Sequence, residues 1–170
     1  AAAALAWAVG TDPDAIAAGL ARFRPVAGRM QIFTLAGGAH LIDDAYNANP
    51  ASVAAALQTL ADLRGSGAGV AVLGDMLELG EQSANLHAEI GVRLAETGVA
   101  QVHLTGAFAR TTADAAVAAG LARERIVFFT SPEEVVADLK DRLRAGDWIL
   151  VKGSRRMRLD AVVQAIRAAL

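Results

Sequence analysis

The chain has 170 residues, of which 54% are hydrophobic and 20% are charged, and its formal net charge at pH 7 is -2. This length suffices for one well-buried domain with a small appendage, and the negative charge argues against the basic surface that nucleic-acid binding requires. No apolar run approaches the length of a membrane span, and the absence of cysteine excludes disulfides and thiolate metal sites. We expect a cytoplasmic, monomeric protein without nucleic-acid partners.

Two short helices and a linker are predicted at the start of the chain. The Ala-rich run from Ala1 to Val9 lacks a capping residue, and Asp12 followed by Pro13 begins a second helix. Proline and glycine in the stretch Arg24–Gly28 end this pattern, so we interpret that stretch as a linker to the main domain. Because the chain starts without Met inside a helical pattern, we expect it to be a fragment of a longer protein.

The main domain is predicted to begin with an antiparallel hairpin at a sheet edge, formed by Met30–Leu35 and Ala39–Asp43 around Gly37-Gly38. From Pro50 onward helical and strand patterns alternate, with strands expected at residues 70–73, 102–104, 126–129 and 148–151. The stretch from Ser131 to Glu134 is typical of a capping box. Strands separated by single helices run parallel. The predicted class is α/β, a Rossmann-like and mostly parallel sheet with helices on both faces and an antiparallel edge hairpin.

Polar side chains follow the ends of the predicted strands, which share one rim in a parallel sheet. They are Asp43 and Asp44, Asp75, Thr105, and Lys152 with Ser154. A structural alternative for Asp44 is the acceptance of backbone N–H bonds, and Asn49 before Pro50 is favoured as a helix N-cap. Adjacent carboxylates repel each other and a structural turn needs only one, so the Asp43-Asp44 pair favours a functional role.

Three motifs carry a further signal. They are Gly28-Arg29-Met30, the stretch Asp-Asp-Ala-Tyr-Asn-Ala-Asn-Pro from Asp43 to Pro50, and Val-Leu-Gly-Asp-Met-Leu-Glu-Leu-Gly from Val72 to Gly80. Together they resemble the C-terminal domain of the Mur ligases. The sequences of these motifs are most similar to those of the members that add D-alanyl-D-alanine to UDP-N-acetylmuramoyl-tripeptide in peptidoglycan synthesis. The resemblance implies that residues 28–170 are the Rossmann-like C-terminal domain and that residues 1–27 are the helical tail of the central ATPase domain.

The resemblance implies a nucleotide-binding role for Arg29, Asp44, Asn47 and Asn49. In the Mur ligases the residues at the positions of Arg29 and Asp44 contact the ATP ribose and nearby nucleotide groups. A carboxylate that accepts from vicinal hydroxyls, beside a guanidinium that can fork to oxygens, suits this role. We expect Asp44→Ala in the intact enzyme to weaken nucleotide use more than it weakens folding.

The resemblance also implies contacts to D-alanyl-D-alanine for Asp75, Lys152, Ser154 and Arg155. Backbone donors and cations that gather after the last strand suit a carboxylate. The structural alternatives are a solvated loop around Asp75 and a solvated basic helix start after Lys152. Packing is the role that we expect for His87.

The chain has only two lysines, and neither lies in a Gly-x-x-x-x-Gly-Lys-Ser/Thr phosphate loop. In the Mur ligases this loop, the Mg²⁺ ligands and the residues around the acyl phosphate belong to the central domain. We therefore expect no catalytic residue and no metal ligand in this chain, which alone should be inactive. The implied cofactors are ATP and Mg²⁺, and the implied partners are the two substrates and the rest of the same protein.

Two other functions share parts of this pattern. A receiver-like signalling module would use Asp75 as the phosphorylated residue, with Thr105 and Lys152 at later strand ends, although a further strand lies between those two. A dinucleotide-binding dehydrogenase domain is set aside, because Gly65–Gly69 follows a helix and precedes a strand, which is the wrong order for a Gly-x-Gly-x-x-Gly loop. A Mur ligase with another amino-acid substrate stays open.

Overall fold

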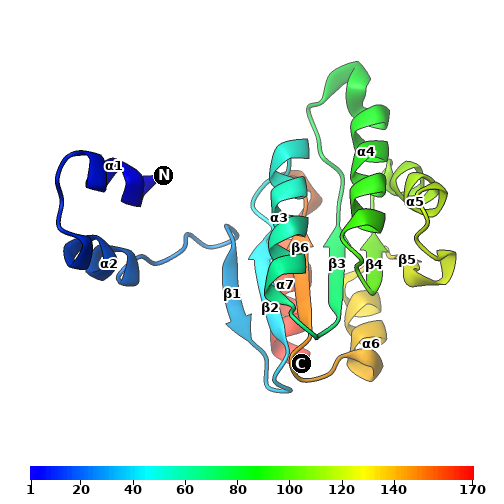
Figure 1. Ribbon diagram of the computed structural model, residues 1–170. Coiled ribbons are helices and arrows are strands. Elements are labelled where there is room, and N and C mark those ends of the chain that lie inside the picture. Colours follow the sequence, from blue (N-terminus) through cyan, green and yellow to red (C-terminus); the bar gives the residue numbers. More distant parts are fainter.

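The computed structural model describes all residues from 1 to 170, and its elements alternate as the sequence predicts (Figure 1). The strands are β1 (Gln31–Thr34), β2 (His40–Asp44), β3 (Gly69–Leu73), β4 (Gln101–Leu104), β5 (Ile126–Phe128) and β6 (Trp148–Lys152). The helices are α1 (Ala2–Ala8), α2 (Pro13–Ala21), α3 (Pro50–Leu63), α4 (Ser83–Glu96), α5 (Ala109–Ala118), α6 (Pro132–Arg142) and α7 (Asp160–Ala169). Three short 3₁₀ helices, η1 (Gly80–Gln82), η2 (Arg123–Arg125) and η3 (Arg155–Met157), complete the chain.

The six strands form one sheet in the order β1-β2-β6-β3-β4-β5. Only the edge pair β1 and β2 is antiparallel, and the other neighbours run parallel. The predicted α/β class with an antiparallel edge hairpin is therefore confirmed. Because β6 lies between β2 and β3, Lys152 is in register with Asp44 on one side and with Leu73 on the other. The carboxyl ends of three strands that are distant in sequence thus meet at one rim.

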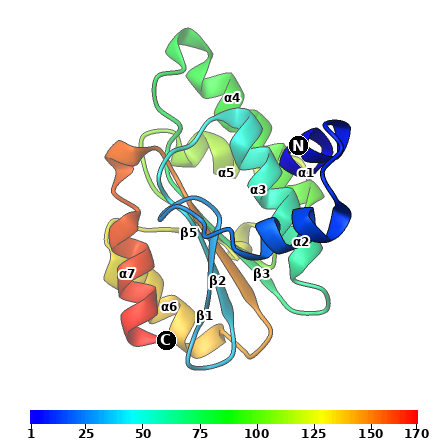
Figure 2. The ribbon, with the colours of Figure 1, turned by 90° about the vertical axis from the view of Figure 1, so that its left-hand side faces the viewer.

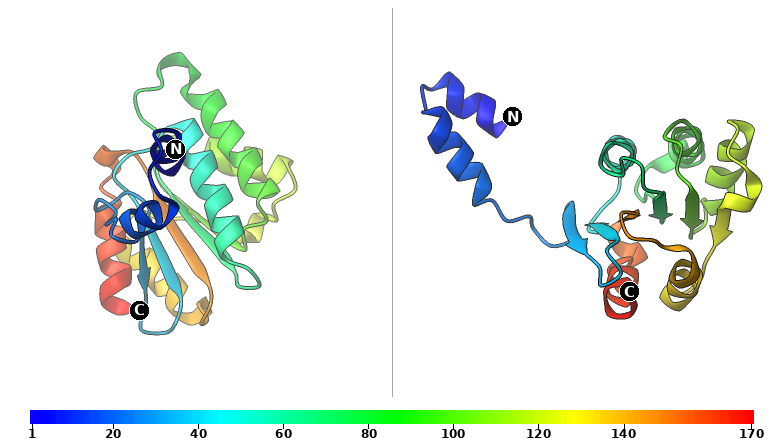
Figure 3. Two further views of the ribbon diagram at one scale, coloured as in Figure 1. Left: turned by 60° about the vertical axis from the view of Figure 1, so that its left-hand side comes forward. Right: turned by 60° about the horizontal axis from the view of Figure 1, so that its bottom comes forward.

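Helices cover both faces of the sheet, with α3, α4 and α5 on one side and α6 and α7 on the other (Figures 2 and 3). Each face has its own hydrophobic core, of 20 and 15 buried residues respectively. Alternate residues of a strand point to opposite faces, so Ile42 packs in the α3-side core and Leu41 in the α7-side core. The same alternation directs Asp44 toward α3 and Asp43 toward α7.

The helices α1 and α2 stand apart from this body and are joined to β1 by an extended stretch (Figure 1). Neither helix contains a buried residue, and the side chains of Trp7 and Phe23 are 65% and 67% exposed. Asp12 caps α2 as predicted, because its carboxylate accepts from the backbone N–H groups of Asp14 and Ala15. No helix of the chain has the length and hydropathy of a membrane-spanning segment.

The predicted capping of α3 is confirmed, whereas that of α6 is wrong in detail. Asn49 Oδ1 accepts from the backbone N–H of Ser52, whose hydroxyl in turn accepts from the Asn49 N–H. The Ser131 side chain makes no such bond. Glu134 instead accepts from both the backbone N–H and the hydroxyl of Thr130, and these bonds lower the pKa of Glu134. Thr130 offers two donors to this carboxylate. The contact of Glu134 therefore falls on Thr130, one residue before the predicted partner Ser131.

Candidate functional site

A buried ion pair joins the ends of β2 and β6. Lys152 Nζ lies 2.5 Å from Asp44 Oδ2 and donates to the carbonyl oxygen of Asn47 at 3.0 Å. The other carboxylate oxygen of Asp44 accepts from the backbone N–H of Met30 at 3.1 Å. The Lys152 side chain is only 3% exposed, so this lysine is not the solvated cation of a basic helix start. Its position fixes the orientation of the Asp44 carboxylate and of the loop that follows β2.

This ion pair forms one wall of a pocket of about 340 Å³ between the linker, the β2–α3 loop and α3, which we call the α3-side pocket. Its lining residues are Gly28, Arg29, Met30, Asp44, Tyr46, Asn47, Asn49, Ser52, Ala55, Ala56, Thr59 and Lys152. All four residues predicted to bind a nucleotide are in this set. Asn49 both caps α3 and lines the pocket, so the two roles suggested for it are compatible.

Tyr46 is a site residue for which the sequence predicts no role. The guanidinium carbon of Arg29 lies 4.1 Å from the centre of its ring, and that of Arg155 lies 5.2 Å away. Arg155 also donates to the Tyr46 hydroxyl at 3.2 Å. Such contacts between guanidinium groups and an aromatic ring are stabilising. One feature of the sequence could have indicated this residue: the only tyrosine of the chain lies in the polar loop after β2.

Asp75 and Ser154 hold loops together at the same rim. Both carboxylate oxygens of Asp75 accept backbone N–H bonds, from Ala107 at 2.7 Å and from Phe108 at 3.1 Å, just before α5. Ser154 Oγ accepts from the backbone N–H of Leu77 at 2.8 Å, and the Ser154 N–H donates to the Asp75 carbonyl. Both residues are buried. These contacts favour structural roles, and the substrate contacts predicted for Asp75 and Ser154 stay predictions.

His87 packs beneath the loop after β3, as the sequence predicts. Its Nε2 accepts from the backbone N–H of Met76 at 2.9 Å, its Nδ1 donates to the Ser83 carbonyl at 2.7 Å, and its ring stacks on Phe108. Nε2 also lies 3.8 Å from the Asp75 carboxylate. No group of three His, Cys, Asp or Glu side chains in the chain is placed to hold a metal ion.

His103 is a fully buried histidine on β4, away from the rim. Burial lowers its pKa from 6.5 to about 4, although Asp138 Oδ2 lies 3.1 Å from its Nε2 and acts in the opposite direction. Between pH 6.5 and 4 the unfolded chain therefore binds more protons than the folded chain, so stability falls as the pH falls. The full effect is about 3 kcal/mol.

We expect the free energy of unfolding of wild type to decrease over this pH range, and the His103→Leu variant to lose most of that slope. Urea unfolding at pH 7, 6, 5 and 4 measures both chains. Burial raises the pKa of Asp43, which gives an opposite slope in acid, but that contribution is common to the two chains. Equal slopes for the two chains would contradict the assignment to His103.

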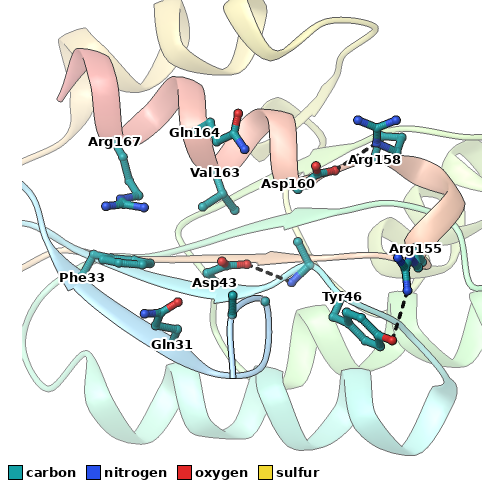
Figure 4. A pocket seen from close by; sticks show the side chains of 13 residues that line it. Gln31, Phe33, Asp43, Tyr46, Arg155, Arg158, Asp160, Val163, Gln164 and Arg167 are labelled. Carbon is teal, nitrogen blue, oxygen red and sulfur yellow. Dashed lines mark hydrogen bonds and ion pairs between the residues drawn. The ribbon is translucent and has the colours of Figure 1, made fainter. Parts of the chain in front are cut away.

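A second and larger pocket, of about 550 Å³, lies on the other face of β2, beneath α7 (Figure 4). We call it the α7-side pocket. Its lining residues are Ala27, Gly28, Gln31, Phe33, Asp43, Ala45, Tyr46, Arg155, Arg158, Asp160, Val163, Gln164 and Arg167. Arg155 lines this pocket, whereas Lys152 lines the α3-side pocket. The cluster predicted from Lys152 to Arg155 is thus divided between the two faces of the sheet.

Comparisons with known proteins identify the family of the chain. The family model of the Mur ligase, glutamate ligase domain matches residues 28–155. The chain is 32% identical, over 91% of its length, to the UDP-N-acetylmuramoyl-tripeptide–D-alanyl-D-alanine ligase of Bacillus subtilis, and 36% identical, over 98%, to that of Escherichia coli. It covers 34% and 35% of these relatives, so it spans about a third of their length.

Solved structures show the same relationship. The MurF ligase from Thermotoga maritima in complex with ADP has a TM-score of 0.79 at 27% identity, over 98% of this chain and 36% of that one. A MurF structure from Acinetobacter baumannii has a TM-score of 0.77 at 29% identity, over 96% of this chain and 35% of that one. The family model and the relatives, taken with the fold and the rim, show that the chain belongs to the Mur ligase family, as its C-terminal domain.

Proposed function

We propose that this chain is the C-terminal domain of an ATP-dependent ligase that adds D-alanyl-D-alanine to UDP-N-acetylmuramoyl-tripeptide in peptidoglycan synthesis. The relatives that cover nearly the whole chain carry this activity in their names, and one solved neighbour is a complex with ADP. The observation that supports the proposal most strongly is the α3-side pocket, which brings together Arg29, Asp44, Asn47 and Asn49.

In this proposal the α3-side pocket receives the ribose end of the nucleotide. A carboxylate has about four lone-pair positions, and Asp44 uses two of them for Met30 and Lys152, so it can still accept from ribose hydroxyls. The exposed guanidinium of Arg29, stacked on Tyr46, adds donors at the mouth. A pocket of about 340 Å³ suits part of a nucleotide, and the chain has no phosphate loop to hold the rest.

The remaining parts of the reaction are assigned to the rest of the protein. We propose that residues 1–27 are the tail of the central ATPase domain, whose phosphate loop and Mg²⁺ ligands complete the site, and that residues 28–170 are the C-terminal domain. The relatives are about three times as long as this chain, and the family model begins at residue 28. The chain alone is then inactive, and the intact ligase is a cytoplasmic monomer.

The chemical role of this domain is to present the amine and to exclude water. ATP phosphorylates the substrate carboxylate, and the amine of D-alanyl-D-alanine attacks the resulting acyl phosphate. Closure of this domain over the nucleotide protects that hydrolysable intermediate from water. Of the residues proposed to contact the dipeptide, Asp75, Lys152 and Ser154 are buried, whereas Arg155 is exposed at the rim.

The test is ADP release by the full-length protein that contains this chain. With UDP-N-acetylmuramoyl-tripeptide and ATP, release is expected only when D-alanyl-D-alanine is present. Single amino acids replace the dipeptide in a parallel series, and activity with one of them instead would identify a Mur ligase of another substrate class. A folded protein that releases no ADP under any of these conditions would overturn the proposal.

A further inference from the structure

The residues Gly28, Arg29 and Met30 form a turn that connects the linker to β1, and this turn is bound closely to the loop after β2. The Tyr46 N–H donates to the Gly28 carbonyl oxygen at 3.0 Å, and the Met30 N–H donates to Asp44 Oδ1 at 3.1 Å. A Cβ atom at Gly28 would lie 3.1 Å from Tyr46 Cβ, so glycine suits this close approach of the two segments. The backbone of Arg29 is therefore held beside the α3-side pocket from both of its neighbours.

Both neighbours of Arg29 have a left-handed backbone conformation, with φ 72 at Gly28 and φ 52 at Met30. This conformation is costly for methionine, and it persists only where the surrounding contacts fix it. Here the bond to Asp44 and the packing of the Met30 side chain against the α3-side core supply those contacts. The turn thus retains strain at Met30 and presents the side chain of Arg29 to the pocket.

The Arg29 guanidinium packs on the ring of Tyr46, with its carbon 4.1 Å from the ring centre. Its side chain forms no ion pair and no hydrogen bond with the rest of the chain, and the residue is exposed. An exposed arginine without a partner populates many rotamers, and binding a ligand must then order it. The ring restricts these rotamers before any nucleotide arrives.

The Tyr46 ring is itself fixed in place. Its hydroxyl accepts from Arg155 at 3.2 Å, as Figure 4 shows, and the carbonyl oxygen of the next residue, Asn47, accepts from the buried Lys152 Nζ at 3.0 Å. Tyr46 is nevertheless 37% exposed, so its ring presents a surface rather than filling the core. A ring that is fixed at its edge and at its backbone can orient the guanidinium that packs on its face.

Resting on the function proposed above, we propose that Tyr46 is a positioning residue for nucleotide binding. Its ring orients the Arg29 guanidinium toward the nucleotide in the α3-side pocket, and the ring itself makes no bond to the nucleotide. The face of the ring carries this role. The hydroxyl only helps to orient the ring, through its bond with Arg155.

The experiment measures steady-state ADP release by the full-length ligase, with ATP varied and the other two substrates in excess. Tyr46→Leu is expected to raise the KM for ATP about fivefold, the equivalent of about 1 kcal/mol for a lost guanidinium–ring contact. Tyr46→Phe keeps the ring, so it is expected to restore the KM for ATP to within about twofold of wild type. The dissociation constant for ADP, measured by calorimetry, is expected to follow the same order without depending on turnover.

A double-mutant cycle shows whether Tyr46 acts through Arg29. In the Arg29→Gln background, Tyr46→Leu is expected to raise the KM for ATP by less than about twofold more, because the side chain that it orients is already absent. The matched control is Phe128→Leu. The Phe128 ring also contacts two guanidinium groups, those of Arg110 and Arg123, at 5.5 and 5.1 Å, but it lines neither pocket. This variant is expected to keep the wild-type KM for ATP.

The two ways of failing are distinct. A folded wild-type ligase that neither binds ADP nor releases it from ATP would overturn the proposed function and this inference with it. An active wild type would overturn this inference alone if Tyr46→Leu kept the wild-type KM for ATP, or if Tyr46→Phe raised it as much as Tyr46→Leu does. Effects of Tyr46→Leu and Arg29→Gln that multiply in the double variant would also overturn it, because the ring would then act on the nucleotide independently of Arg29.

Discussion

Asp44→Ala is expected to lower the free energy of unfolding by about 3 kcal/mol, because it leaves the ammonium of Lys152 buried without its partner. The Lys152 side chain is 3% exposed and that of Asp44 is 13% exposed, so solvent screens little of this loss. The variant also removes the acceptor of the Met30 N–H bond. Urea unfolding of the 170-residue chain at pH 7 measures the change.

Removing the lysine as well provides the control. Lys152→Met in the Asp44→Ala background is expected to recover most of the stability, because an apolar side chain of similar length replaces the unpaired charge. An Asp44→Ala chain as stable as wild type would contradict the buried ion pair. The sequence alone predicts that Asp44→Ala affects nucleotide use more than folding. Because Asp44 also pairs with the buried Lys152, we expect the variant to affect both nucleotide use and stability.

Asp75→Ala is expected to destabilise the chain by about 3 kcal/mol, since the carboxylate accepts two backbone N–H bonds before α5 in a buried position. Gly106 shows how closely this junction is packed. It has φ +113, and a Cβ atom there would overlap with Asp75 Cγ. No side chain fits between the carboxylate and the loop that it holds.

Asp75→Asn serves as the matched variant for this prediction. Its one remaining acceptor oxygen is expected to retain part of the lost stability. Treatment of the wild-type chain with acetyl phosphate is expected to add no phosphoryl group, because the Asp75 carboxylate is buried and each of its oxygens accepts a backbone N–H bond. An Asp75→Ala chain of unchanged stability, with phosphorylation of the wild-type residue, would instead support a receiver-like module.

Local patterns predicted the elements of this fold because each has its own signal. The alternation of helical and strand periodicity gave the parallel class, and Asn49 with Pro50 gave the start of α3. The strand order was not predictable in this way. The insertion of β6 between β2 and β3 depends on packing over the whole sheet, and it alone places Lys152 beside Asp44, 108 residues away in sequence.

Only part of the site was predictable, because the strand order decides which residues distant in sequence come together. Arg29, Asp44, Asn47 and Asn49 lie close in sequence to the β2 rim, and they do share one pocket. The adjacent residues Lys152, Ser154 and Arg155 were expected to act together, but the sheet divides them. Alternation along β6 and the turn into η3 direct Lys152 to one face and Arg155 to the other. The same turn places Arg158 beside the α7-side pocket, which Arg155 also lines.

Arg29→Gln in the full-length ligase tests most directly the proposal that the α3-side pocket contacts the nucleotide. Unlike Asp44, Arg29 is exposed and forms no ion pair, so its loss can be measured apart from folding. The KM for ATP is expected to rise about tenfold or more, with the free energy of unfolding of the 170-residue chain within about 0.5 kcal/mol of wild type. A KM for ATP and a turnover equal to those of wild type would contradict a nucleotide contact at this pocket.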